Sequence, residues 1–118
     1  MNNLEQFYAA IGSDAKPVIG RFCGNADMAK RFIIKFTNDS SFGDLTQALT
    51  DNRTDDAFRA AHTLKGICLN LGFDKLSGIT SCVTELLRNV DLSGAKNAFP
   101  ELQEEYHRVT DAVNTLLK

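Results

Sequence analysis

The feature that most constrains the fold of this chain is an apolar pattern with the helical repeat, which recurs in one segment after another. Apolar residues spaced i, i+3, i+4 and i+7 lie on one face of an α-helix, whereas a half-buried strand needs strict alternation. Leu4, Phe7, Tyr8 and Ile11 show the helical spacing at the start of the chain. Similar helical segments are predicted at about residues 17–22, 25–36, 40–49, 54–71, 76–90 and 102–116. The inner face predicted for the segment 25–36 consists of Ala29, Phe32, Ile33 and Phe36.

Residues that start and end helices separate these segments. Gly12, Gly24 and Gly72 each follow an apolar run and suit a helix C-terminus, and Asn25 can cap the helix that follows it. Pro100 is expected to begin the last helix proper rather than to kink it. The sequence has no alternating Val/Ile/Thr run and no Asn-Gly or Asp-Gly hairpin turn. We therefore predict an all-α fold, an antiparallel four-helix bundle with additional short N-terminal helices.

Length and composition narrow the class of protein. A chain of 118 residues fits a single domain, which we expect to span residues 1–118 with the four-helix core in about residues 26–117. The formal charge of −2 gives no reason to expect a nucleic acid or a membrane surface as partner. No apolar run approaches the length of a membrane span, and the N-terminus lacks the pattern of a secretory signal. We expect a cytoplasmic protein.

The three cysteines support the same compartment. Cys23, Cys68 and Cys82 are odd in number and widely spaced, which makes a poor disulfide framework, and no C-x-x-C pair is present. Each falls in an apolar stretch, where a free cysteine acts as a small hydrophobe. We expect all three to be buried, reduced thiols.

The segment from Thr54 to Leu71 carries the most informative polar residues. On a helical wheel its core stripe consists of Ala57, Ala61, Leu64, Cys68 and Leu71. His62 lies more than a quarter turn beyond the edge of that stripe, toward solvent. The residues on its side of the helix are Asp55, Phe58, Arg59, Lys65, Gly66 and Leu69.

Three details of this face indicate a reactive imidazole. Gly66 lies one turn after His62 and leaves it open to a bulky partner, although a glycine inside a helix costs about 1 kcal/mol against alanine. Lys65 can turn its ammonium toward an anion held on His62. Phe58 and Leu69 flank the histidine as an apolar contact for a docked protein would.

Each detail also has an ordinary explanation. A surface histidine on a helix usually has no function, Gly66 could allow close helix packing, and Lys65 could be a solubilising charge. Phe58 and Leu69 could belong to a wide core stripe. Taken together these explanations are less convincing than singly, but the residues alone leave phosphotransfer as one candidate among several.

A motif changes this balance. The run Ala61-His62-Thr63-Leu64-Lys65-Gly66, followed by Asn70-Leu71-Gly72, resembles the signature of histidine-containing phosphotransfer (HPt) domains of bacterial phosphorelays. A bare H-x-x-K-G would arise by chance in roughly one unrelated chain of this length in a hundred, and the longer pattern is much rarer. The resemblance extends from about Phe32 through Arg88, whereas the N-terminal segments and the last helix agree only in general character.

The resemblance implies specific roles. His62 would be the phosphorylated residue, Lys65 the charge partner of the phosphoryl group and Gly66 the clearance for the partner. The partners would be receiver domains and a hybrid sensor kinase, with Mg²⁺ bound by the receiver and no cofactor on this chain, which we expect to be a monomer. The docking surface is expected to comprise Phe58, Arg59, Ile67 and Leu69.

The sequence departs from the family pattern in two places. Ile67 and Leu69 are bulky where the family usually has small residues, and a glutamate common in the next helix falls at Thr84, with Glu85 one place off. These differences affect the docking surface and the identity of the partner rather than the phosphorylation site.

Two other functions compete with a phosphocarrier. The chain has no glycine-rich phosphate loop and no kinase signature, so we interpret it as a carrier rather than a kinase. An enzyme could use His62, or His107 with Glu104 and Asp111 one turn away on either side, but no nucleophile or metal-ligand set accompanies them. An interaction adaptor could keep the HPt-like fold without being phosphorylated.

Overall fold

The computed structural model describes residues 2–118, and α-helices are the only regular secondary structure within that range. None of these helices is both long and apolar enough to cross a membrane. The helices are α1 (Asn3–Ile11), α2 (Ala15–Arg21), α3 (Ala26–Phe36), α4 (Ser41–Thr50), α5 (Thr54–Asn70), α6 (Asp74–Arg88) and α7 (Leu92–Leu116).

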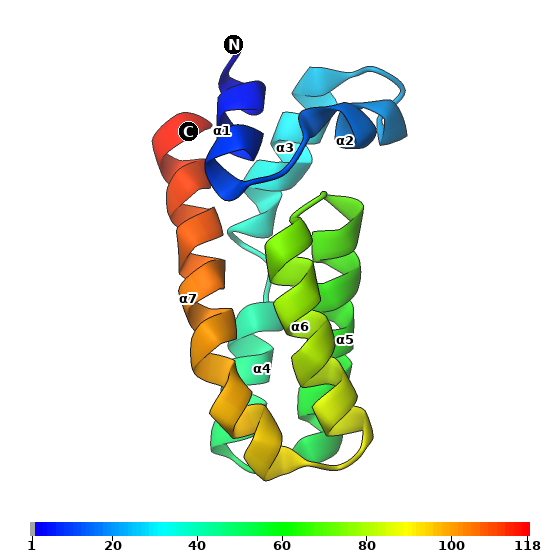
Figure 1. The fold of residues 1–118 in the computed structure, drawn as a ribbon, viewed down its shortest axis with the longest axis vertical. Helices are drawn as coiled ribbons and strands as arrows, with labels where there is room; N and C mark the ends of the chain where they lie inside the picture. The colour runs from blue at the N-terminus through cyan, green and yellow to red at the C-terminus, as the bar shows by residue number, and fades with distance from the viewer. Residues whose placement is uncertain (1) are drawn as a thin grey trace.

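The helices α4 to α7 form an antiparallel bundle, in which successive helices alternate in direction and are joined by short turns (Figure 1). The helix α5 packs against both α4 and α6, and α7 packs against α6. The short helices α1 and α2 lie at one end of the bundle, where α1 packs against the C-terminal part of α7 (Figure 1). The predicted all-α bundle with short N-terminal helices is confirmed.

The core explains which face of each bundle helix points inward. The stripe predicted for α5 is buried throughout, since Ala57, Ala61, Leu64, Cys68 and Leu71 are at most 4% exposed. The N-terminal helices join this core through an aromatic cluster, in which the ring of Phe73 makes edge contacts with Phe7 and with Phe36. Burial of these side chains fixes the rotation of α5 and leaves His62 on its solvent face.

Three polar contacts hold the C-terminal end of α5. The Tyr8 hydroxyl donates a hydrogen bond of 2.6 Å to the Leu71 carbonyl oxygen. The Arg21 guanidinium donates to the carbonyl oxygens of Leu69 and Asn70, at 3.3 and 2.7 Å. These carbonyls are among the acceptors that a helix end leaves without intrahelical partners. The N-terminal helices therefore serve as the cap of the helix that carries His62.

Gly72 ends α5 as predicted, and the structure shows why no other residue suits the position. Its backbone has a φ of +72°, in the left-handed region, and a Cβ at this position would lie 2.5 Å from Cγ2 of Val18. The glycine thus combines a turn that L-residues disfavour with close contact between α2 and the end of α5.

Pro100 does not begin the last helix, contrary to the prediction. The helix α7 starts eight residues earlier, at Leu92, and the Asp91 side chain caps it by accepting a 2.8 Å hydrogen bond from the Gly94 backbone N–H. The residues before the proline are held by packing, because Ala95 is fully buried and the ring of Phe99 stacks on that of Phe42. Pro100 itself is exposed, so its missing N–H and its ring fall on the solvent side of the helix.

Two further expectations about burial are wrong. Cys68 is buried, but Cys23 and Cys82 are exposed; all three thiols are free. Cys23 lies in the turn after α2 with a φ of +55°, and Cys82 lies on the outer face of α6. Phe32 of α3 was expected on the inner face of its helix with Ile33 and Phe36, yet its side chain is 47% exposed.

Candidate functional site

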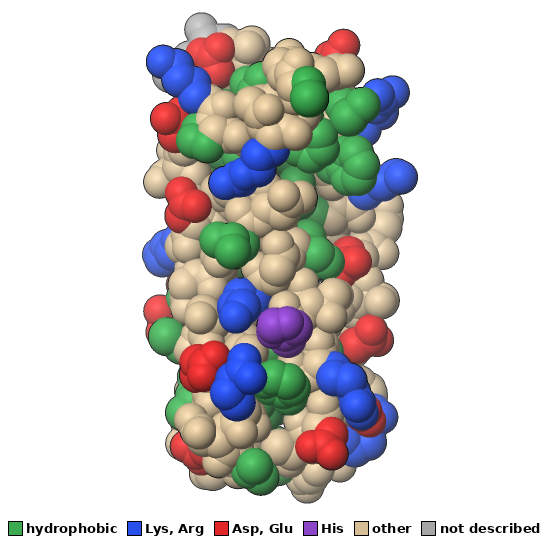
Figure 2. Space-filling model, turned by 90° about the vertical axis from the view of Figure 1, so that its right-hand side faces the viewer, with side chains coloured by type: hydrophobic (Ala, Val, Ile, Leu, Met, Phe, Trp, Pro, Cys, Tyr) green, Lys and Arg blue, Asp and Glu red, His purple; other side chains and the backbone are tan. Residues whose placement is uncertain are grey.

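His62 lies in the middle of α5 on the face that points away from the bundle core, and it is exposed. The preceding residue, Ala61, and Leu64 are fully buried, so the backbone beneath the imidazole is held by the core. Figure 2 views the side of the molecule formed by α5 and α6 and shows a histidine with hydrophobic and basic side chains beside it. A partner can therefore approach the ring without any change in the fold.

Gly66 leaves open space next to the imidazole. The residue is helical and exposed, and a Cβ built on it would meet no atom within 4 Å. Close packing against another helix therefore does not explain the glycine, which removes one of the ordinary explanations. The missing side chain leaves space for a group of a partner molecule one helical turn from His62.

The two basic residues predicted near His62 are held differently. Arg59 is exposed and its guanidinium donates to the Asp56 carboxylate at 2.8 Å; the same carboxylate accepts from Arg53 at 2.9 Å. The Arg59 hydrogen bond is the main cause of the lowered pKa of Asp56, and the pair raises the pKa of Arg59. Lys65 is partly buried and takes part in no ion pair within residues 2–118. Of these two basic residues, Lys65 is therefore the one whose charge is not already paired with a carboxylate.

A stack of rings connects His62 to the neighbouring helix. The Phe58 ring lies nearly parallel to the imidazole, with an interplanar angle of 19° and 5.9 Å between centroids. The Arg88 guanidinium of α6 lies over the same Phe58 ring, with its Cζ 5.0 Å from the centroid, and also contacts Glu85 at 3.2 Å. Sequence reasoning missed Arg88, because nothing in the α6 pattern alone shows which residue of α5 it faces.

The predicted docking residues are not equally exposed. Leu69 is 59% exposed, whereas Phe58 and Ile67 are partly buried and pack against the core. Phe58 is therefore both a surface residue beside His62 and a support of the bundle. On α6, Glu85 lies on the outer face beside Arg88, whereas Thr84 is buried and donates to the Thr80 carbonyl oxygen at 2.8 Å.

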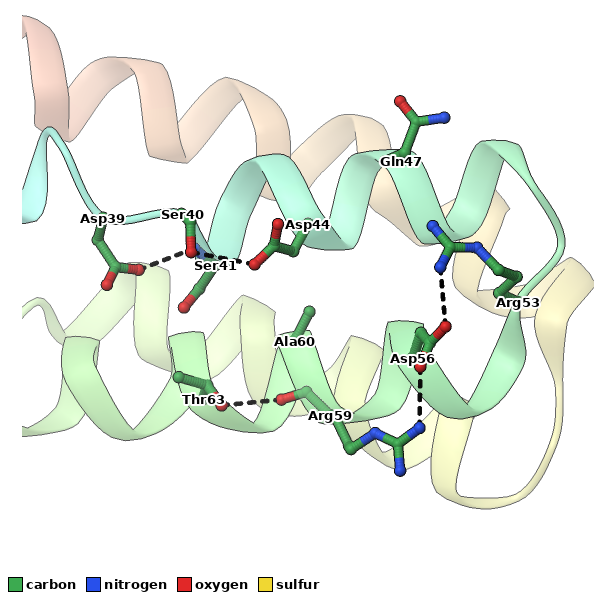
Figure 3. A pocket seen from close by; sticks show the side chains of 10 residues that line it. All are labelled: Asp39, Ser40, Ser41, Asp44, Gln47, Arg53, Asp56, Arg59, Ala60 and Thr63. Atoms are coloured by element: carbon green, nitrogen blue, oxygen red, sulfur yellow. Dashed lines mark hydrogen bonds and ion pairs between the residues drawn. The ribbon is translucent and has the colours of Figure 1, made fainter.

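A polar groove of about 570 Å³ runs between α4 and α5 and shares Arg59 with the His62 side of α5 (Figure 3). Its charged groups largely take part in ion pairs or hydrogen bonds within the groove. Asp56 bridges Arg53 and Arg59, and Asp44 accepts a hydrogen bond of 3.0 Å from the Ser40 hydroxyl. Because these charges are satisfied within the groove, we assign it no ligand.

His107, the other histidine, lies exposed on α7 near the edges of two aromatic rings, those of Phe42 and Tyr106. Glu104 and Asp111 are also exposed. Within residues 2–118 there is no cluster of three His, Cys, Asp or Glu side chains that could hold a metal ion. The arrangement around His107 is that of a solvated helix face.

Comparison with known proteins gives one match. The model of a family described as the Hpt domain matches residues 35–112 of the 118-residue chain. The matched region contains the whole of α4, α5 and α6 and most of α7, and with them His62, Lys65 and Gly66. No curated protein and no solved structure matches the chain.

Proposed function

Because the chain belongs to the Hpt domain family, we propose that it is a phosphorelay carrier that accepts a phosphoryl group on His62 from the aspartyl phosphate of a receiver domain and passes it to another receiver. The proposal extends to a hybrid sensor kinase as the source of the phosphoryl group and to a monomeric carrier. Domains of this family carry phosphoryl groups without kinase activity of their own.

The observation that carries the proposal is the open space at Gly66 beside an exposed His62. Lys65 lies between them in sequence and forms no ion pair within residues 2–118. A helix interior gains about 1 kcal/mol from alanine over glycine, and the packing here would accept an alanine. We explain the glycine by the space that it leaves for a partner protein, which must come close to His62 to exchange a phosphoryl group.

The chemical step asks little of the carrier. A neutral imidazole nitrogen has a lone pair available near pH 7, so it attacks the phosphorus without a general base. The new N–P bond forms as the P–O bond to the receiver aspartate breaks, in line and through a loose transition state, and the aspartate leaves as a carboxylate. The reverse sequence hands the group to a second receiver. By family resemblance the attacking atom is the distal ring nitrogen.

The residues around His62 then have separate tasks. Lys65 compensates the charge of the phosphoryl group on the imidazole, as a charge-assisted partner. Gly66 admits the receiver loop that carries the aspartate. Mg²⁺ belongs to the acidic pocket of the receiver, and this chain supplies no ligand to it. Phe58, Arg59, Ile67 and Leu69 form the docking surface around the histidine.

The experiment compares the two histidines. Incubation with a phosphorylated receiver domain should label the wild type with acid-labile, base-stable phosphate. His62→Gln should abolish the label, and His107→Gln, which removes the other exposed helical histidine, should retain it at the wild-type level. Label that persists in His62→Gln would refute the site. A chain that binds the receiver but never takes up phosphate would be an adaptor.

A further inference from the structure

Exposed hydrophobic side chains gather at the end of the bundle that carries the N-terminal helices. Within residues 2–118 the exposed large hydrophobics are Met28, Phe32, Leu69 and Val90, at 36, 47, 59 and 74%. Val90 lies in the turn between α6 and α7, at the opposite end (Figure 1). The other three, with the partly buried Phe22 and Ile67, are here called the N-terminal apolar patch.

The patch draws on α3, the turn after α2 and the end of α5, where Ile67 faces α3 and Leu69 lies on the exposed side. The rings of Phe22 and Phe32 stack with centroids 5.2 Å apart, and Met28 lies one turn before Phe32 on α3. Phe32 and Ile67 line a common hollow of about 240 Å³ between α3 and α5. Figure 2 shows hydrophobic side chains gathered in the upper part of the same face that presents a histidine.

The patch continues the surface around His62. Leu69 follows His62 by seven residues, which places it two turns further along the same side of α5, at a distance of about 10 Å. A domain of about 100 residues has a radius of gyration of about 13 Å, so a receiver seated on His62 also covers surface at this distance. The partner that reaches the imidazole is thus the partner best placed to cover the patch.

Charge favours a receiver over a second copy of this chain. The ammonium of Lys35 lies 5.7 Å from the centroid of the Phe32 ring, and Arg21 lies at the end of α5. The acidic group in the hollow, Asp39, already accepts a 2.9 Å hydrogen bond from the Ser41 backbone N–H. A two-fold dimer through the patch would bring these cations of the two copies together, which disfavours a second copy of this chain as the occupant.

We propose that the N-terminal apolar patch is a second contact for the receiver domain that docks at His62, and that it selects which receiver is accepted. The inference rests on the proposed function and adds the residues that discriminate among partners. Phe22, Met28 and Phe32 precede residue 35, where the family match begins. The phosphorylated histidine thus lies in the region that matches the family model, whereas part of the proposed selective contact lies in helices before that region.

The test compares two exposed hydrophobic residues at opposite ends of the bundle, Phe32 and Val90. Each variant, Phe32→Ala and Val90→Ala, is incubated with phosphoramidate, a small phosphoryl donor that needs no docking surface. Each is then titrated with a panel of isolated receiver domains phosphorylated by acetyl phosphate and Mg²⁺. Met28→Ala, one turn before Phe32 on α3, repeats the measurement at a second patch residue outside the docking surface around His62. Sedimentation velocity gives the oligomeric state.

Phe32→Ala and Met28→Ala should each weaken binding of the preferred receiver by about tenfold and reduce the difference in affinity between it and the other receivers, because exposed anchors of this size contribute about 1–2 kcal/mol to binding. Labelling by phosphoramidate and the affinity of Val90→Ala should stay unchanged. Wild-type receiver affinity in both patch variants would overturn the inference and leave the proposed function intact. A wild-type dimer that Phe32→Ala dissociates, with receiver affinity unchanged, would assign the patch to self-association. A wild type that no donor labels would refute the proposed function itself.

Discussion

The side chains around His62 differ in how firmly the fold holds them. Phe58 is partly buried, its ring stacks against the imidazole and the Arg88 guanidinium lies over the same ring, so the ring has little freedom to move. Arg59 is tied to Asp56, whereas Lys65 has no carboxylate partner within residues 2–118. An aromatic support that stays in place and a cation that can move suit the proposed role of His62, in which the charge on the imidazole changes as a phosphoryl group arrives and leaves.

At Gly66 stability and transfer should respond in opposite directions. Gly66→Ala should raise the free energy of unfolding by up to about 1 kcal/mol, because the added Cβ meets no atom within 4 Å and alanine favours the helix. Gly66→Gln should fold normally but slow transfer from a receiver sharply, since its side chain fills the clearance beside His62. Thermal melts and single-turnover transfer rates measure the two effects.

Gly43 of α4 is the matched control, because it is also helical, exposed and free of atoms within 4 Å of a built Cβ. Gly43→Gln should leave the transfer rate unchanged. If Gly66→Gln transfers as fast as Gly43→Gln, the clearance argument is wrong.

At the scale of the element, the end of α5 depends on contacts that no local pattern contains. Gly72→Ala should lower the free energy of unfolding by about 2–4 kcal/mol, because a left-handed alanine costs about 1 kcal/mol and its Cβ overlaps Val18. Gly12 has a similar φ of +78°, but a Cβ there would meet nothing within 4 Å, so Gly12→Ala should lose about 1 kcal/mol only. Denaturant unfolding of both variants makes the comparison. Equal losses would show that contact with α2 does not hold this end.

Helical periodicity predicted the elements well, because each bundle helix buries one regular stripe. The sequence therefore located α5, its core residues and its stop at Gly72, and with them the outward position of His62. It misplaced the start of α7, because the burial of Ala95 and the stacking of Phe99 on Phe42 are tertiary contacts that outweigh the local preference of proline.

The errors at single residues have the same origin. Phe32 fits the apolar pattern of α3, but its neighbours in the fold leave it on the surface against Phe22. Arg88 could not be assigned to the site, because its contact with Phe58 depends on the relative rotation of two helices. For the candidate site, a motif could propose His62, Lys65 and Gly66, whereas the supports of the histidine come from packing.

At the scale of the whole molecule, His62 and the contacts that support its helix lie at different positions along the long axis of the bundle. The helices matched by the Hpt family hold His62, and α1 and α2 cap the end of α5 through Tyr8 and Arg21. The same end bears the N-terminal apolar patch, and Figure 2 shows hydrophobic side chains gathered on the upper part of a face that also presents a histidine. A carrier must bind one receiver, leave it and bind the next, so its contacts must be small and brief, below about 1,200 Å² of total buried surface.

The most direct test of the carrier is a chase. Protein labelled on His62 with ³²P is freed of its donor and mixed with an unphosphorylated receiver domain and Mg²⁺, and the label on each protein is followed over time. A carrier should lose its acid-labile label as the receiver gains an equal amount of aspartyl phosphate. Label that remains on the chain, or that appears only as inorganic phosphate with no receiver intermediate, would contradict the assignment.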